Sequence, residues 1–167
     1  MVAEAKIHQA RNVLELGPGT GALTHAIRGR LAPGSSYLGI ERNTAFVQQL
    51  TGDFPELSFT ASSIEEYDLD QHCQNTGGQF DAVVSGLPWT TFPESLQTQI
   101  LDHVLPRIAP GGRFVTFAYT GFHLLPSGQR FRSLLKRRLA RVSTTPTIWV
   151  NVLPAFVYVG TNLNGVA

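Results

Sequence analysis

A glycine-rich turn after an apolar run constrains the fold of this chain more than any other feature. The run Val13–Leu16 is followed by three glycines at alternate positions, from Gly17 to Gly21, and a segment of helical character, Ala22–Leu31, comes next. This layout predicts a strand that stops at a sharp turn, where a ligand can approach bare backbone. The alternative is a tight strand–helix turn that binds nothing.

A second apolar run, Ser36–Glu41, predicts a strand that ends in an acid about twenty residues after the last glycine. A carboxylate at this place can accept hydrogen bonds from both hydroxyls of a ribose. Dinucleotide sites use G-x-G-x-x-G to face a pyrophosphate, but here the third glycine comes one residue earlier and Glu15 precedes the turn. A carboxylate repels a pyrophosphate and attracts the sulfonium or ammonium of S-adenosylmethionine.

The pattern Glu15-x-Gly17-x-Gly19-x-Gly21 resembles the first motif, E/D-x-G-x-G-x-G, of the class I S-adenosylmethionine-dependent methyltransferases. The resemblance implies S-adenosylmethionine as cofactor. It places Ser63 where the family often has an Asp that contacts the adenine amino group, although Ser62 and Ser63 can equally form a plain turn or helix cap. The cofactor-binding residues expected from it are Glu15, Gly17, Pro18, Gly19, Thr20, Gly21, Glu41, Arg42, Ser63, Ile64, Ser85 and Gly86.

Strand and helix patterns alternate along most of the chain. The expected strands are Asn12–Leu16, Tyr37–Glu41, Leu57–Ala61, Phe80–Ser85 and Arg113–Tyr119, and the expected helices are Thr20–Leu31, Thr44–Thr51, Glu65–Cys73, Glu94–Ile108 and Gln129–Ala140. Such alternation predicts a parallel sheet with helices on both faces. Thr147–Val152 and Ala155–Gly160 are too close for a crossover helix, so they should pair antiparallel. We expect an α/β, Rossmann-like fold forming a single domain over residues 1–167.

The segment Ser85–Trp89 follows a buried strand, at the edge where open α/β sheets bind ligands. Enzymes that methylate nucleobase amines carry Asn/Asp-x-Pro-Tyr/Phe there, and Gly86 occupies the place of the amine acceptor, which counts against adenine N6 methylation. The segment, with Phe92-Pro93 after it, resembles the S-G-L-P and F-P motifs of the bacterial phospholipid N-methyltransferases.

Two further stretches, Gly112–Tyr119 and Trp149–Tyr158, are similar to motifs of the same family. The resemblance implies N-methylation of the phosphatidylethanolamine head group. It points to four residues around the transferred methyl group: Leu87, Pro88, Trp89 and Tyr119. Trp89 and Tyr119 can favour a methylammonium by cation–π attraction, or can simply be core and rim packing. An rRNA adenine N6-dimethyltransferase-like enzyme and a non-catalytic cofactor-binding or membrane-surface module remain alternatives.

Family members carry a substantial region before the glycine motif that helps to cover the active site and attach to membrane. Only about ten residues precede the first expected strand here. We therefore expect this N-terminal cap region to be largely absent.

Charge is divided unevenly between the two parts of the chain. Residues 1–102 hold all 12 acids and five Lys or Arg, whereas residues 103–167 hold eight Lys or Arg and no acid. The second part is suited to an anionic partner, unless the two parts neutralise each other in the folded domain. Its most basic stretch, residues 129–142, has helical apolar spacing and the cations Arg130, Arg132, Lys136, Arg137, Arg138 and Arg141. An anionic membrane surface is the favoured partner; a solvated helix face and an RNA backbone are the alternatives.

The remaining features of the sequence concern the cellular compartment and the presence of a metal site. Cys73 is the only cysteine, no apolar stretch is long enough to cross a bilayer, and the polar first residues do not form a secretory signal. We expect a cytoplasmic protein, peripheral at the inner face of the membrane. The histidines have no metal-like spacing, so no metal site is expected, and His123 or solvent would take the proton of the amine substrate.

Overall fold

The computed structural model describes residues 1–149 and 154–162. Within them, seven strands form one sheet in the order β3-β2-β1-β4-β5-β7-β6. The strands are β1 (Asn12–Leu16), β2 (Ser36–Glu41), β3 (Ser58–Ala61), β4 (Phe80–Ser85), β5 (Ile108–Tyr119), β6 (Arg141–Thr144) and β7 (Ala155–Thr161).

Strands β1 to β5 run parallel, and β7 lies antiparallel between β5 and β6. The predicted fold, a mostly parallel sheet that ends in an antiparallel hairpin, is confirmed. Because the strand order reverses beside β1, the carboxyl ends of β1 and β4 flank the place where sheets of this kind bind ligands.

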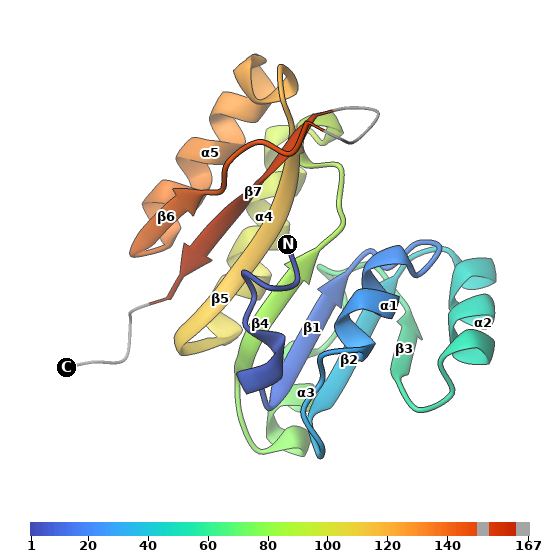
Figure 1. Cartoon of the computed structure of the whole chain (residues 1–167). Coiled ribbons are helices and arrows are strands. Elements are labelled where there is room, and N and C mark those ends of the chain that lie inside the picture. The colour runs from blue at the N-terminus through green and yellow to red at the C-terminus, as the bar shows by residue number, and fades with distance from the viewer. Residues whose placement is uncertain (150–153, 163–167) are drawn as a thin grey trace.

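Helices cover both faces of the sheet (Figure 1). They are α1 (Ala22–Arg28), α2 (Thr44–Asp53), α3 (Leu69–Thr76), α4 (Glu94–Val104) and α5 (Pro126–Arg138), with short 3-10 turns η1 (Ile7–Gln9), η2 (Trp89–Thr91), η3 (Leu105–Arg107) and η4 (Phe122–Leu124). Side chains alternate along each strand, so two apolar clusters form. One contains Leu14, Leu101 and Leu134 and lies under α4 and α5; the other contains Val13 and Ile27 and lies under α1.

The bounds of all five helices differ from the prediction; α4, for example, ends at Val104, and Ile108, its predicted last residue, begins β5. Two of the differences have clear local reasons. Gly21, in a left-handed conformation with φ 85°, is the N-cap of α1, so the helix begins at Ala22 rather than Thr20. The helix expected over Glu65–Cys73 is α3, which begins at Leu69 because the Asp68 side chain accepts a hydrogen bond from the Gln71 N–H (2.8 Å).

The basic stretch is only partly helical, which corrects the prediction. Helix α5 ends at Arg138, and Arg141 lies in β6, where it pairs with Thr161 of β7. Val142 fits the helical apolar spacing and a strand equally well, so the pattern could not separate the two. The strand expected over 147–152 lies partly outside the described residues; inside them, Ile148 forms an isolated bridge with Ala155.

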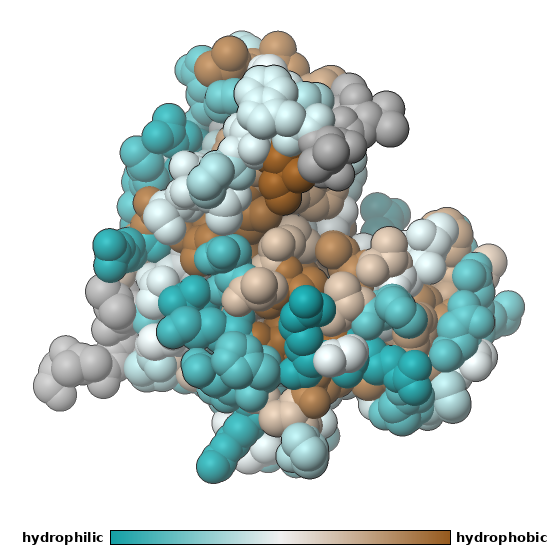
Figure 2. Space-filling view, viewed as in Figure 1, coloured by the Kyte–Doolittle hydropathy of each residue, from teal (hydrophilic) through white to brown (hydrophobic). Residues whose placement is uncertain are grey.

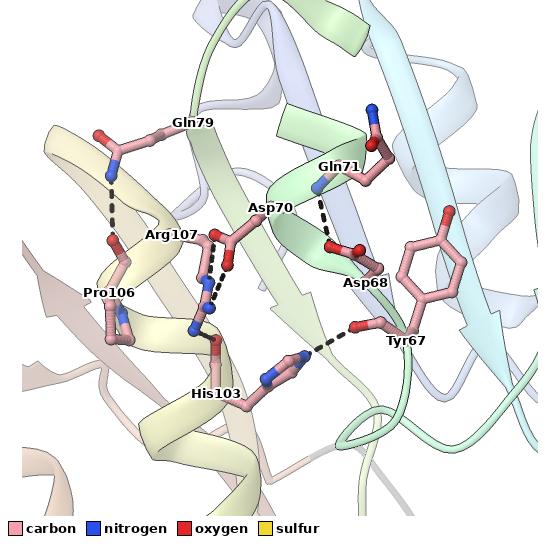
Figure 3. A network of polar contacts seen from close by, with 8 residues as sticks. All are labelled: Tyr67, Asp68, Asp70, Gln71, Gln79, His103, Pro106 and Arg107. Atoms are coloured by element: carbon pink, nitrogen blue, oxygen red, sulfur yellow. Dashed lines mark hydrogen bonds and ion pairs between the residues drawn. The ribbon is translucent and has the colours of Figure 1, made fainter. Parts of the chain in front are cut away.

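A polar network ties α3 to the end of α4, at the edge opposite the carboxyl ends of the strands (Figure 3). The Arg107 guanidinium donates to both carboxylate oxygens of Asp70 (2.9 and 2.6 Å) and to the His103 carbonyl (2.7 Å). His103 Nε2 lies 2.8 Å from the Tyr67 carbonyl oxygen. The hydrogen bonds from Arg107 lower the pKa of Asp70, so this carboxylate stays charged. The network is structural and leaves the opposite edge for ligands.

Candidate active site

The glycine turn has the backbone that the motif predicts. Gly17, Gly19 and Gly21 all have left-handed φ angles, of 68°, 57° and 85°. A Cβ added at Gly17 would lie 2.7 Å from Cδ2 of Leu87, and one at Gly21 would lie 3.0 Å from Cδ2 of Leu50. The left-handed backbone therefore favours glycine at all three positions.

A cavity of about 90 Å³ lies against this turn, at the carboxyl ends of β1 and β2. Four of the residues expected at the cofactor line it: Gly17, Glu41, Arg42 and Ile64. Glu41 Oε2 accepts the Gly19 N–H (3.1 Å) and its Oε1 accepts the Asn43 N–H (2.9 Å). Glu41 therefore presents a carboxylate to the cavity in a fixed orientation. Pro18 is buried and Thr20 is exposed, and neither lines the cavity.

The serine pair after β3 is arranged differently from the expectation. Ser62 lines the cavity, whereas Ser63 does not, and the Ser63 hydroxyl is buried without a hydrogen-bond partner in the described part of the chain. Ile64 is almost fully buried and contributes an apolar wall. Ser62 therefore faces the cavity in this structure, and the adenine contact expected of Ser63 stays a prediction.

Glu15 does not line the cavity, which corrects the expectation that its carboxylate faces a bound cation directly. It is fully buried on the α1 side of the sheet, where Oε2 accepts hydrogen bonds from Tyr37 Oη (2.5 Å) and Thr24 Oγ1 (2.9 Å). Burial raises the pKa of Glu15 to about 7, and these two hydrogen bonds oppose the shift. Oε1 has no partner among the described residues. Tyr37 and Thr24 carry no recognisable motif, so the sequence did not single them out.

Ser85 organises the turn that follows β4 and is itself buried. Its Oγ accepts hydrogen bonds from the Trp89 indole N–H (3.0 Å) and from the Leu87 N–H (3.3 Å). A Cβ added at Gly86 would lie 2.8 Å from the Gly17 carbonyl oxygen, so the two turns touch at this point. Ser85 and Gly86, expected at the cofactor, line neither of the cavities at this edge and act by holding this turn.

Gln97 of α4 fixes the same turn from the other side. It is buried, and its Nε2 donates to the Trp89 carbonyl (2.7 Å) and the Phe92 carbonyl (3.3 Å). Sequence reasoning missed this residue. Its place on the face of α4 that also carries Ile100, Leu101 and Val104 is the signal that could have identified it.

A second, larger cavity of about 260 Å³ opens at the carboxyl ends of β4 and β5. All four residues expected around the transferred methyl group, Leu87, Pro88, Trp89 and Tyr119, line it. Its wall is mostly aromatic and no Asp or Glu is among the described residues that form it; the rings belong to Trp89, Phe117, Tyr119, Phe122, Phe131 and Tyr158. The arrangement suits an apolar group or an amine whose charge is received by ring faces.

Leu87 lines both cavities and stands between them. Trp89 is only 3% exposed, and its indole stacks on Phe131 of α5 with ring centroids 4.6 Å apart. A ligand in the cavity beside Glu41 and a ligand in the aromatic cavity would therefore meet at Leu87. Group transfer needs the reacting atoms of the two ligands about 3–3.5 Å apart, so the ligands would have to touch each other beside Leu87.

Comparison with known proteins identifies the family of this chain. Residues 14–114 match the family described as Methyltransferase domain. The chain belongs to this family. The ornithine lipid N-methyltransferase of Singulisphaera acidiphila is 38% identical over 107 residues, which are 63% of this chain and 56% of that protein. The ribosomal RNA small subunit methyltransferase A of Streptococcus pneumoniae is 31% identical over 117 residues, 69% of this chain and 39% of that protein.

Solved structures agree on the fold. The N-methyltransferase NodS from Bradyrhizobium japonicum WM9 superposes with a TM-score of 0.75 over 96% of this chain and 92% of its own, at 15% identity. At this identity the likeness shows the class I methyltransferase fold and nothing finer. The chain spans about half the length or less of the two curated relatives above.

S-adenosylmethionine is the cofactor of this methyltransferase, as predicted. The residues present fit it. Glu41 holds a fixed carboxylate at the end of β2, where a ribose can be bound, and the glycine turn leaves bare backbone beside the cavity.

The cations of α5 differ in their availability. The Arg138 guanidinium pairs with Asp102, and Arg130 lies 3.6 Å from Glu94. Among the residues described, Arg132, Lys136 and Arg137 form no ion pair. Residues 1–149 and 154–162 contain no helix long and apolar enough to cross a bilayer, and no group of three potential metal ligands.

Proposed function

We propose that this methyltransferase transfers a methyl group to the amine of a membrane lipid, with the phosphatidylethanolamine head group as substrate. One observation carries the proposal: an aromatic cavity, with no carboxylate among the described residues that line it, shares Leu87 with the cavity beside Glu41. The relative that is named an ornithine lipid N-methyltransferase supports an amine on a lipid as the acceptor.

The aromatic cavity can prepare an amine for methylation without a covalent intermediate. The amine nitrogen needs a free electron pair, and burial among apolar rings disfavours its protonated form. The bound cofactor supplies an electrophilic methyl group. Trp89 and Tyr119 line the cavity and would attract the methylammonium product by cation–π interaction. The departing proton would pass to solvent, because Nδ1 of His123 accepts the Gly121 N–H and Nε2 carries the proton of the neutral ring.

The mouth of this cavity supports contact with a membrane. The large apolar side chains exposed in the described part of the chain all lie on two segments: Tyr119, Phe122, Leu124, Leu125, Ile148 and Trp149. The segments lie side by side because Ala155 pairs with Tyr119 and bridges to Ile148. Apolar surface is visible at the top of Figure 2, the end where α5 begins in Figure 1. We call this set the mouth surface.

The charge near the mouth surface fits an anionic lipid interface. The exposed cations Arg130, Arg132, Lys136 and Arg137 follow it on α5, and no acid occurs after Asp102. Each cation near an anionic bilayer contributes about 1 kcal/mol, and exposed Trp and Leu side chains are suited to the interface itself. Arg138 contributes less to this surface, because it is paired with Asp102.

An adenine N6-dimethyltransferase activity on rRNA is the second candidate. The relative that is named a ribosomal RNA methyltransferase favours it. Gly86 argues against this activity. Enzymes that methylate exocyclic nucleobase amines carry a side chain that accepts a hydrogen bond at the corresponding position, and glycine has none.

A paired transfer assay tests the proposal. The protein is given radiolabelled S-adenosylmethionine with phosphatidylethanolamine vesicles in one reaction and with unmodified small-subunit rRNA in another. We expect label in the lipid and none in the RNA. Label in the RNA alone would support the second candidate. Cofactor binding without transfer to either acceptor would indicate a non-catalytic module.

A further inference from the structure

A polar groove of about 240 Å³ adjoins the aromatic cavity and has no role in the function proposed so far. It is formed by the end of β6, the residues after it, and side chains from η4, α5 and β7. His123 and Tyr158 line both the groove and the aromatic cavity. A molecule with a short linker could therefore place one end in each.

The groove offers hydrogen-bond donors and no acidic side chain among the described residues that line it. Arg132 provides an exposed guanidinium that forms no ion pair with a described residue, in contrast to Arg130 and Arg138. The Thr145 hydroxyl is occupied, since it accepts the Val157 N–H (3.0 Å) and donates to the Pro146 carbonyl (3.2 Å).

The other donors come from two threonines and a histidine. The hydroxyls of Thr144 and Thr147 have no hydrogen-bond partner in the described part of the chain, and both residues line the groove. Nδ1 of His123 accepts the Gly121 N–H (3.3 Å), so the neutral ring carries its proton on Nε2. The ring also packs edge-on against Phe156, with centroids 5.0 Å apart and planes at 90°, which fixes its orientation.

We propose that this groove binds the anionic group of a zwitterionic substrate whose amine occupies the aromatic cavity. The inference rests on the function proposed above and deepens it, because it makes a phosphate or carboxylate near the amine a requirement of recognition. Arg132 forms the charge-assisted hydrogen bonds, and His123, Thr144 and Thr147 add neutral ones. In phosphoethanolamine, two carbons and one oxygen join the amine to the phosphorus, a linker short enough for two compartments that share a wall.

Binding of soluble head groups tests the inference without relying on catalysis. Phosphoethanolamine, ethanolamine and inorganic phosphate are titrated by calorimetry into the full chain saturated with S-adenosylhomocysteine. We expect phosphoethanolamine to bind more tightly than either fragment. Arg132→Gln should weaken its binding about tenfold or more, because a charge-assisted pair is lost, and Arg132→Lys should restore part of it. Arg11→Gln, an equal charge change just before β1 at the opposite edge of the sheet, should keep the wild-type affinity.

The outcomes separate this inference from the function on which it rests. Equal affinity of the wild type and Arg132→Gln for phosphoethanolamine, or no binding by the wild type, would overturn the anion groove. Phosphate alone binding as tightly as phosphoethanolamine would assign the groove to free phosphate and overturn its link to the amine. If Arg132 controls head-group binding but no lipid is methylated, the anion-binding role of the groove is supported and the proposed reaction is refuted. If Arg132→Gln methylates lipid as well as the wild type does, the proposed reaction is supported and the anion-binding role of the groove is refuted.

Discussion

At the scale of single residues, two carboxylates near the glycine turn differ in what they can do. Glu41 ends β2 at the cavity and is oriented by two backbone N–H groups, whereas Glu15 lies inside the protein against Tyr37 and Thr24. The sequence motif placed both at the cofactor, because spacing records position along a strand and not the side to which a carboxylate turns. The hydrogen bond from Tyr37 to Glu15 forms only because β2 pairs with β1 in the folded sheet.

The first prediction concerns Glu41. Glu41→Ala removes the carboxylate expected to hold the ribose and frees the Gly19 N–H, so the affinity for S-adenosylmethionine should fall about tenfold or more. Isothermal calorimetry measures this directly. Glu66→Ala, an exposed acid outside the cavity, is the control and should bind as the wild type does. Unchanged affinity in Glu41→Ala would refute the ribose assignment.

The second prediction concerns the pH dependence of stability. Glu15 ionises at about pH 7 in the folded protein, against an ordinary pKa of 4.5. Its contribution to stability is therefore fully present below pH 4.5 and is lost as the pH rises to 7, a change on the order of 3 kcal/mol. The free energy of unfolding of the wild type, relative to Glu15→Gln, should fall by this order between pH 4.5 and 8 in urea titrations. A difference that is independent of pH would contradict the buried, proton-binding state.

At the scale of elements, the turn after β4 is the piece that connects the two cavities. Ser85 holds it from within, Gln97 holds it from α4, and Leu87 is left at the boundary between the compartments. Its position at the end of a buried strand was predictable from the sequence, and so was the glycine turn beside it. The hydrogen bonds that fix the turn after β4 were not predictable from the sequence, because Gln97 and the indole N–H of Trp89 meet their partners only when α4 packs on the sheet.

The third prediction tests the anchoring of this turn. Ser85→Ala leaves the buried Trp89 N–H without an acceptor and should lower the free energy of unfolding by about 1–3 kcal/mol. Thr91→Ala removes an exposed hydrogen bond to the Pro88 carbonyl in the same turn and should cost less than about 1 kcal/mol. Chemical denaturation of both variants provides the comparison. Equal losses would show that Ser85 does not anchor Trp89.

The hairpin at the end of the sheet shows where pattern reading fails. Its existence follows from the short connection between two strand-like runs, and the structure confirms it. β6 (Arg141–Thr144) is a strand that the sequence did not predict, whereas the strand expected over 147–152 extends beyond the described residues, within which Ile148 bridges to Ala155. Helical and strand periodicities both accommodate Val142, and the choice depends on pairing with β7, which the local sequence does not encode.

At the scale of the whole molecule, the ligand sites and the mouth surface occupy one edge. The cavity beside Glu41, the aromatic cavity and the proposed anion groove all lie toward the carboxyl ends of the strands, and Tyr119 and Phe122 of the mouth surface line the aromatic cavity. The sequence predicted the basic character of this part of the chain. It did not separate paired from available cations, because Asp102 and Glu94 belong to α4 and reach α5 only in the folded protein.

The fourth prediction concerns membrane contact. Replacing Leu124, Leu125 and Trp149 together by Ser removes three exposed apolar side chains and should weaken binding to anionic vesicles at least about tenfold, at roughly 1 kcal/mol or more for each. Charge reversal at Lys136 and Arg137 should also weaken binding, and this effect should diminish at high salt. Vesicle sedimentation measures both. Gln48→Ser on α2 is the control, and vesicle binding indifferent to both sets of changes would refute the mouth surface.

The most direct test of the account is the structure of this protein with S-adenosylhomocysteine and phosphoethanolamine bound together. We expect the ribose at Glu41, the sulfur next to Leu87, and the amine among the aromatic rings and in contact with the sulfur side of the cofactor beside that residue, with the phosphate at Arg132. A nucleoside bound elsewhere, or an amine that does not enter the aromatic cavity, would contradict it.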